Sequence, residues 1–201
     1  IATYGMSTIV YGINCLYFAK KPNNSQPIGG IRNDLTVLSS FKVFGQISFL
    51  VVIAVIAIVG VWFLLNKTVF GKNIYIVGGN PEAAAVSGIS VFWVTVGAFI
   101  MAGILYGFGS WLECIRMFGS GSAAYGQGWE MDAIAACVVG GISFTGGIGK
   151  ISGVVVGVFI FTALTYSLTI LGIDTNLQFV FSGVIILVAV MLDCLKYVQK
   201  K

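Results

Sequence analysis

The chain has 201 residues, of which 58% are hydrophobic and only 9% are charged, and its formal net charge is +4 at pH 7. Soluble domains carry about 25% charged residues, so this composition excludes an ordinary water-soluble domain, and the small, scattered charge excludes a nucleic-acid-binding surface. Because the apolar stretches are continuous and do not alternate with polar residues, we expect an all-α bundle of membrane-spanning helices and not a β-barrel.

The first two apolar segments are separated by a long polar region. Residues 1–19 are uncharged and end at Lys20 and Lys21. The chain begins inside this segment, and we interpret residues 1–201 as a single transmembrane domain truncated on its N-terminal side. Residues 20–46 contain proline, asparagine and glycine turn formers and predict a loop. Residues 47–65 are uniformly apolar and predict a spanning helix.

The stretch "GKNIYIVGGNPEAAAVSGI", residues 71–89, lies between two apolar runs. It lacks the GxxxxGK[ST] pattern of a phosphate-binding loop. Pro81 suits the first position of a helix, and Glu82 would lie in the first turn, where the helix dipole favours a carboxylate. We expect a short helix over 81–86, ended by Gly88, whose small face docks on a nucleotide-binding partner. An ordinary structured loop is the alternative.

The remaining apolar segments differ in length. Residues 90–112, 151–172 and 176–193 are long enough to span a membrane. Residues 132–145 are too short and contain Gly140 and Gly141, so we expect a half-helix or re-entrant element, with a tilted ordinary helix as the alternative. Glycines spaced by four, at 103 and 107 and again at 149, 153 and 157, predict close helix packing.

Polar and aromatic side chains gather between the third and fourth segments. Glu113 and Arg116 are three residues apart, so they can pair on one helix face. A candidate substrate route comprises these two residues with Tyr125, Gln127, Trp129, Glu130 and Asp132, beside Ser120 and Ser122. Structural alternatives exist for each, because aromatic residues also line membrane interfaces and the two carboxylates can simply cap the fourth helix.

Two absences limit the chemistry. The sequence has no histidine, the commonest general base and metal ligand, and four cysteines with no CxxC spacing. Cysteines in apolar runs behave as small hydrophobic residues. We therefore expect no metal site, no disulfide framework and no enzymatic activity in the membrane.

Three stretches of the sequence resemble one family. They are residues 71–89, "YGQGWEMDAIAACVVGGISFTGGIGKISGVVVGVFI" and "NLQFVFSGVIILVAVMLD". In this order they resemble the permeases of bacterial ATP-binding-cassette (ABC) sugar importers of the ribose and galactose class. The segment Trp129–Asp132 departs from the usual Tyr-Glu-Leu-Asp, which puts the sugar preference in doubt but not the family.

The resemblance implies a transport subunit in the bacterial cytoplasmic (inner) membrane. Its implied partners are an ABC subunit that binds and hydrolyses ATP, an extracytoplasmic sugar-binding protein that meets residues 20–46, a second permease copy and membrane lipid. The permease itself would bind no cofactor. The positions that match the cytoplasmic coupling loop are Gly78, Gly79, Asn80, Pro81, Glu82, Ala83, Ala84 and Gly88. An ATP-independent secondary sugar transporter or channel is the alternative.

Overall fold

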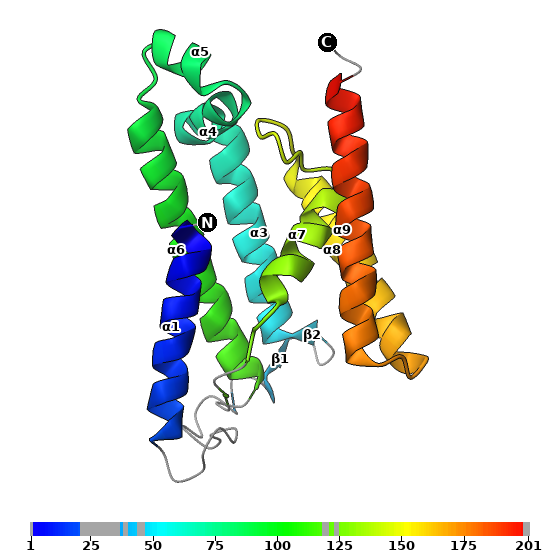
Figure 1. The fold of residues 1–201 in the computed structure, drawn as a ribbon. Helices are drawn as coiled ribbons and strands as arrows, with labels where there is room; N and C mark the ends of the chain where they lie inside the picture. Colours follow the sequence, from blue (N-terminus) through cyan, green and yellow to red (C-terminus); the bar gives the residue numbers. More distant parts are fainter. Residues whose placement is uncertain are drawn as a thin grey trace. The chain divides into compact units, whose positions relative to one another are not determined.

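The computed structural model describes residues 2–20, 37, 40–43, 47–117, 121–122 and 125–198. The described chain is almost entirely helical, which confirms the all-α expectation (Figure 1). It divides into two compact units, Ile1–Ala57 with Ile100–Gln127, and Ile58–Phe99 with Gly128–Lys201. The interpretation of residues 1–201 as one domain stays a prediction.

The first unit contains helix α1 (Ala2–Ala19) and a small antiparallel pair of strands, β1 (Lys42–Val43) and β2 (Ile47–Ser48). Helix α3 (Phe49–Lys67) begins directly after β2, two residues later than the predicted start, because Ile47 and Ser48 pair with β1. The strand pair was not predicted. Most of the expected external loop at 20–46 lies outside the described residues.

Three helices in the described part of the chain are long and apolar enough to cross a membrane: α3, α6 (Val91–Arg116) and α8 (Ile151–Ile170). They confirm the predicted segments 47–65, 90–112 and 151–172 as helices. Helix α9 (Thr175–Val198) contains the predicted segment 176–193 and extends beyond it.

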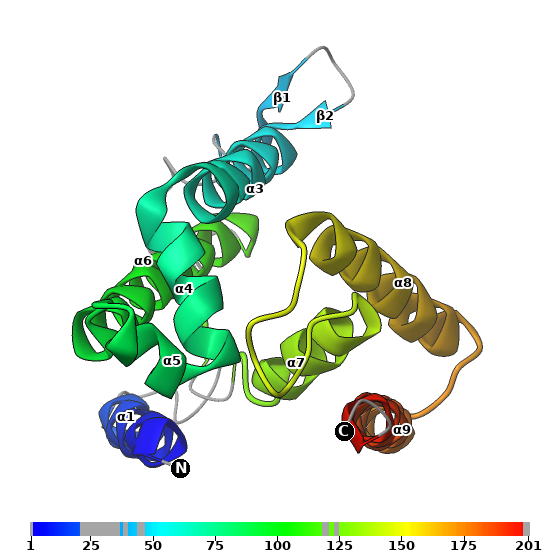
Figure 2. The same cartoon turned by 90° about the horizontal axis from the view of Figure 1, so that it is seen from above.

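The second unit holds two shorter helices between α3 and α6, namely α4 (Val69–Gly79) and α5 (Pro81–Val86). Helix α4 lies crosswise to α3 (Figures 1 and 2). The same unit contains α7 (Trp129–Val139), which packs against both α8 and α9. A buried cluster of Ala135, Ala136 and Phe161 holds α7 to α8.

Helix α7 is the short fourth element expected from the sequence. It has 11 residues, and at 1.5 Å per residue it reaches only about half of the roughly 30 Å hydrocarbon core. It begins three residues earlier than predicted and ends at Val139 with Gly140 as its C-cap, and Gly141 has a left-handed φ of 83°. Its shortness is confirmed, and its re-entrant position in a membrane stays a prediction.

Glycines bring the backbones of α7 and α8 into contact. A methyl group on Gly153 would overlap the carbonyl oxygen of Gly140, and one on Gly157 would lie 2.6 Å from the backbone nitrogen of Gly140. The close packing predicted for this glycine series is therefore confirmed at these two positions. A methyl group on Gly103 or Gly107 would meet no atom within 4 Å outside the backbone of α6 in the described part of the chain, so close packing is not seen there.

Candidate functional site

The segment predicted to dock on a partner forms two helices joined by one residue. We call residues 69–88 the elbow. Asn80 caps both helices, since its backbone N–H donates to the carbonyl of Ile76 at 3.0 Å and its Oδ1 accepts from the N–H of Ala83 at 3.0 Å. Pro81 begins α5 and Glu82 lies in its first turn. The helix predicted at 81–86 is confirmed with its caps.

The first half of the elbow was not predicted. Gly78 and Gly79 lie in the last turn of α4 and not in a loop. The sequence does carry one helix-start signal, because Thr68 is the N-cap residue and its hydroxyl accepts from the N–H of Gly71 at 3.1 Å. The three glycines in α4 are the reason that this helix was not predicted, since glycine disfavours helical interiors.

The elbow folds onto its own small core. Ala84 is fully buried with Val77 and Val94, and its carbonyl accepts the N–H of Ile89 at 3.0 Å. The expectation that Ala84 presents a small face to a partner is therefore wrong, because this methyl group fills space inside the chain. The outward residues of α5 are instead Pro81, Glu82, Ala83, Ala85 and Val86, and Val86 is 91% exposed.

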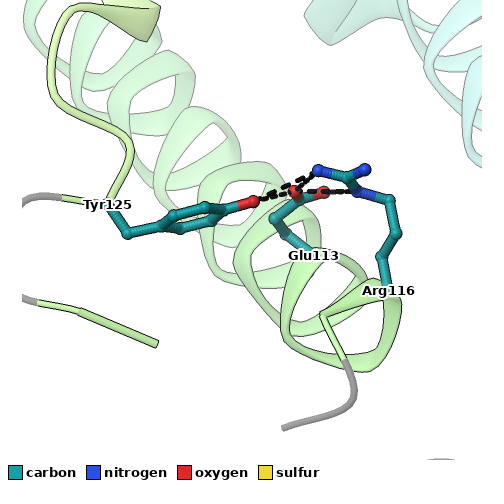
Figure 3. Close-up of polar contacts among 3 residues, drawn as sticks. All are labelled: Glu113, Arg116 and Tyr125. Carbon is teal, nitrogen blue, oxygen red and sulfur yellow. Dashed lines mark hydrogen bonds and ion pairs between the residues drawn. The ribbon is translucent and has the colours of Figure 1, made fainter. Parts of the chain in front are cut away.

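Glu113, Arg116 and Tyr125 form a cluster at the end of α6 (Figure 3). The guanidinium Nε of Arg116 donates to both carboxylate oxygens of Glu113, at 2.8 and 2.9 Å, which confirms the predicted pairing. The Tyr125 hydroxyl donates to Glu113 and accepts from Nη2 of Arg116 at 3.2 Å. Burial, and next the hydrogen bond to Glu113, raise the pKa of Tyr125.

This cluster offers chemistry suited to hydroxyl groups. A carboxylate, a guanidinium and a phenol together supply hydrogen-bond donors and acceptors within one small area. Water reaches the two partners unequally, since the Arg116 side chain is 59% exposed and the Glu113 side chain 22%. Such a group can form and exchange weak hydrogen bonds with a sugar, and it can equally hold the chain after α6 against the helix end.

The other candidate route residues lie before or within the first turn of α7. Gln127, Trp129 and Glu130 are exposed. The N-cap of α7 is Gly128, with no side-chain cap, so neither carboxylate caps this helix. Asp132 instead accepts a hydrogen bond from Ser182 of α9 at 3.3 Å. The seven residues thus belong to two units, and one route through all of them stays a prediction.

Ser120 lies outside the described residues. Among the residues that the structure does describe, no three His, Cys, Asp or Glu side chains lie together in a way that would hold a metal ion.

Comparison with protein families gives one match over nearly the whole chain. The family model described as "Branched-chain amino acid transport system / permease component" matches residues 1–190. The chain is 50% identical to the galactose/methyl galactoside import permease protein MglC of Treponema pallidum, and the alignment covers 100% of the chain and 38% of that protein. It is 46% identical to MglC of Escherichia coli, over 100% of the chain and 60% of that protein.

A ribose relative is more distant. The ribose import permease protein RbsC of Bacillus subtilis is 37% identical over 96% of the chain and 58% of that protein. The chain therefore spans only part of the length of these curated relatives. No solved structure matches it.

Proposed function

The chain belongs to the family of branched-chain amino acid transport system permease components, and we propose that it serves as a membrane-spanning permease of an ATP-driven importer. Its proposed cargo is a monosaccharide or simple galactoside, with galactose or methyl galactoside first. Relatives named for galactose are 44% to 50% identical to the chain, whereas the ribose relative is 37% identical.

The elbow is the observation that carries this proposal. It connects two helices long enough to span a membrane, α3 and α6, and presents a short capped helix with exposed Glu82 and Val86. A partner that changes conformation on binding ATP can transmit its movement only through a rigid element, because a flexible loop would deform instead. The double cap and the buried Ala84 supply that stiffness.

The proposal includes the partners and the location. The ATP-binding subunit supplies the nucleotide site and docks on the elbow from the cytoplasm. The other proposed partners are an extracytoplasmic sugar-binding protein, a second permease copy and lipid of the bacterial cytoplasmic (inner) membrane. The chain's own part is transport, with hydrolysis left to the ATP-binding subunit.

Reconstitution tests this function. The full-length protein is co-purified with its ATP-binding subunit, placed in proteoliposomes with the binding protein, and assayed for uptake of galactose, methyl galactoside, ribose and xylose. We expect uptake of a galactoside that requires ATP and stops when the ATPase subunit is inactivated. Uptake that continues without ATP, or that follows an ion gradient, would instead identify a secondary transporter or channel.

Labelling tests the orientation. Lys72 on α4 and Leu171 after α8 are both exposed, and the proposal places them on opposite sides of the membrane. Single cysteines at these positions, in a background without native cysteines, are treated with a membrane-impermeant maleimide. We expect Leu171→Cys to react from outside and Lys72→Cys only in inverted vesicles. Reaction of both from one side would contradict the topology.

A further inference from the structure

At Gly78 and Gly79 the backbone of the elbow lies directly against the backbone of a second segment. We call residues 140–150, which connect α7 to α8, the α7–α8 turn. A methyl group on Gly78 would lie 2.9 Å from the backbone nitrogen of Gly147, and one on Gly147 would lie 2.6 Å from Cα of Gly79. Gly146 and Gly147 both have left-handed φ angles, 88° and 70°. No side chain separates the two segments, so their approach requires glycine.

Hydrogen bonds and packing hold both segments rigid at this contact. On the elbow side, Asn80 caps both helices and Ala84 is packed beneath α5. On the other side, the N–H of Ser143 donates to the carbonyl of Ile148 at 3.1 Å, which closes the turn. The hydroxyls of Ser143 and Thr145 lie 2.8 Å apart and share a hydrogen bond.

The α7–α8 turn is also fixed to the two helices that it joins. The N–H of Ile142 donates to the carbonyl of Cys137 at 3.1 Å, and the side chain of Ile142 packs over Gly149. Beyond it, the backbones of α7 and α8 touch at Gly140, Gly153 and Gly157. A series of tightly packed contacts therefore runs from α5, through α4 and the turn, into the α7 and α8 pair.

We propose that the contact of Gly78 with Gly146 and Gly147 is a mechanical joint that passes a displacement of α5 directly into α7 and α8. The inference rests on the proposed function, which supplies the push on α5. A contact made by long side chains absorbs movement through rotamer changes, whereas packed backbone transmits it, because protein interiors are close-packed and have low compressibility. Gly78 is thus a positioning residue, and the elbow, the turn, α7 and α8 move as one body.

The chain offers a matched pair of variants. A methyl group on Gly78 would press on the backbone of Gly147, whereas one on Gly79 would lie 3.9 Å from the nearest atom, Cα of Gly147, at ordinary contact distance. Both glycines lie in the last turn of α4, so both substitutions by alanine raise helix propensity similarly. Only Gly78→Ala should separate the two segments.

The first measurement does not depend on transport. Spin labels are placed at exposed Val86 and Ile148, as Val86→Cys and Ile148→Cys, in the full-length protein without native cysteines. We expect a narrow distance distribution that is unchanged when the ATP-binding subunit and nucleotide are added. Gly78→Ala should broaden or shift it, and Gly79→Ala should not. A broad distribution in the parent would overturn the joint.

The second measurement is sugar transported per ATP hydrolysed in proteoliposomes. Gly78→Ala should lower this ratio several-fold while the ATP-binding subunit stays bound. The control for transport is Gly60→Ala in α3, outside the elbow, where an added methyl group would meet nothing within 4 Å, and it should keep the parent ratio. If Gly78→Ala fails to assemble, Ser143→Ala loosens the turn without overlap and should give the same loss. A ratio of sugar transported to ATP hydrolysed equal to that of the parent in Gly78→Ala, or in Ser143→Ala where that variant replaces it, would refute the joint. If the parent protein transports no sugar with ATP but keeps the narrow distance distribution, the proposed function is refuted and the joint is not.

Discussion

Ser182 of α9 donates a hydrogen bond of 3.3 Å to the carboxylate of Asp132 in the first turn of α7, across 50 residues of sequence. Ser182 is only 6% exposed, so its hydroxyl is placed inside the packing between the two helices. This bond joins the short helix, which is held to α8 by backbone contact, to the last helix of the chain.

Removal of this hydroxyl should loosen α7 from α9. We expect Ser182→Ala to lower the free energy of unfolding by about 1 kcal/mol, the usual range for a hydrogen bond between helices in a membrane protein. The matched control is Ser167→Ala, because within the described residues the Ser167 hydroxyl donates to the carbonyl of Ala163 in its own helix. Equal melting temperatures for the two variants in detergent would contradict an interhelical role for Ser182.

The position of Ala84 predicts a loss of stability in the permease alone. Ala84 is fully buried, so Ala84→Trp forces a large side chain into a filled core and should cost at least about 1–3 kcal/mol. Ala85→Trp on the exposed side of α5 is the control and should leave the melting temperature nearly unchanged. The comparison needs no partner subunit. A stable Ala84→Trp variant would show that the elbow core does not form.

Charge reversal on the outer face of α5 should act on the partner and not on the fold. Glu82 is exposed in the first turn of α5, and Glu82→Lys replaces a carboxylate at the positive end of the helix. We expect weaker co-purification of the ATP-binding subunit, or ATP hydrolysis without transport, while the sugar-binding protein still docks. Normal assembly and transport at the parent rate would rule out α5 as the coupling helix.

Tyr125 should give a pH-dependent contribution to stability. Burial, and next the hydrogen bond to Glu113, raise its pKa above the ordinary value of 10.0. A raised pKa in the folded state means that the contribution is fully present below the unfolded pKa and is lost as pH rises through the folded pKa. The difference in melting temperature between the parent and Tyr125→Phe should therefore persist at about pH 8 and shrink above about pH 10.

The control for this titration is Tyr106→Phe, which removes a phenol hydroxyl from a 77% exposed position on α6. It should not reproduce the pH dependence of the Tyr125 variant. If the difference in melting temperature between the parent and Tyr125→Phe stays constant across this pH range, the Tyr125 hydroxyl does not bond to Glu113 in the folded protein.

The sequence predicted those elements that depend on local composition and length. Uncharged runs such as 151–172 require helices in lipid, because backbone groups there must bond within their own segment. Pro81, Glu82 and Gly88 predicted α5 with its bounds, since caps and dipole preferences act within one turn. The pairing of Glu113 with Arg116 followed from helical spacing alone.

Tertiary structure decided which side of each element is used. The sequence shows an alanine at 84, and only the packing of Val77 and Val94 over it shows that this alanine is inside the chain. The spacing of the glycines at 149, 153 and 157 predicted close helix packing, but nothing in the sequence indicated that Gly78 meets Gly146 and Gly147, almost 70 residues away. Contacts of this kind depend on how distant segments meet, and a glycine has no side chain whose character could indicate its neighbour.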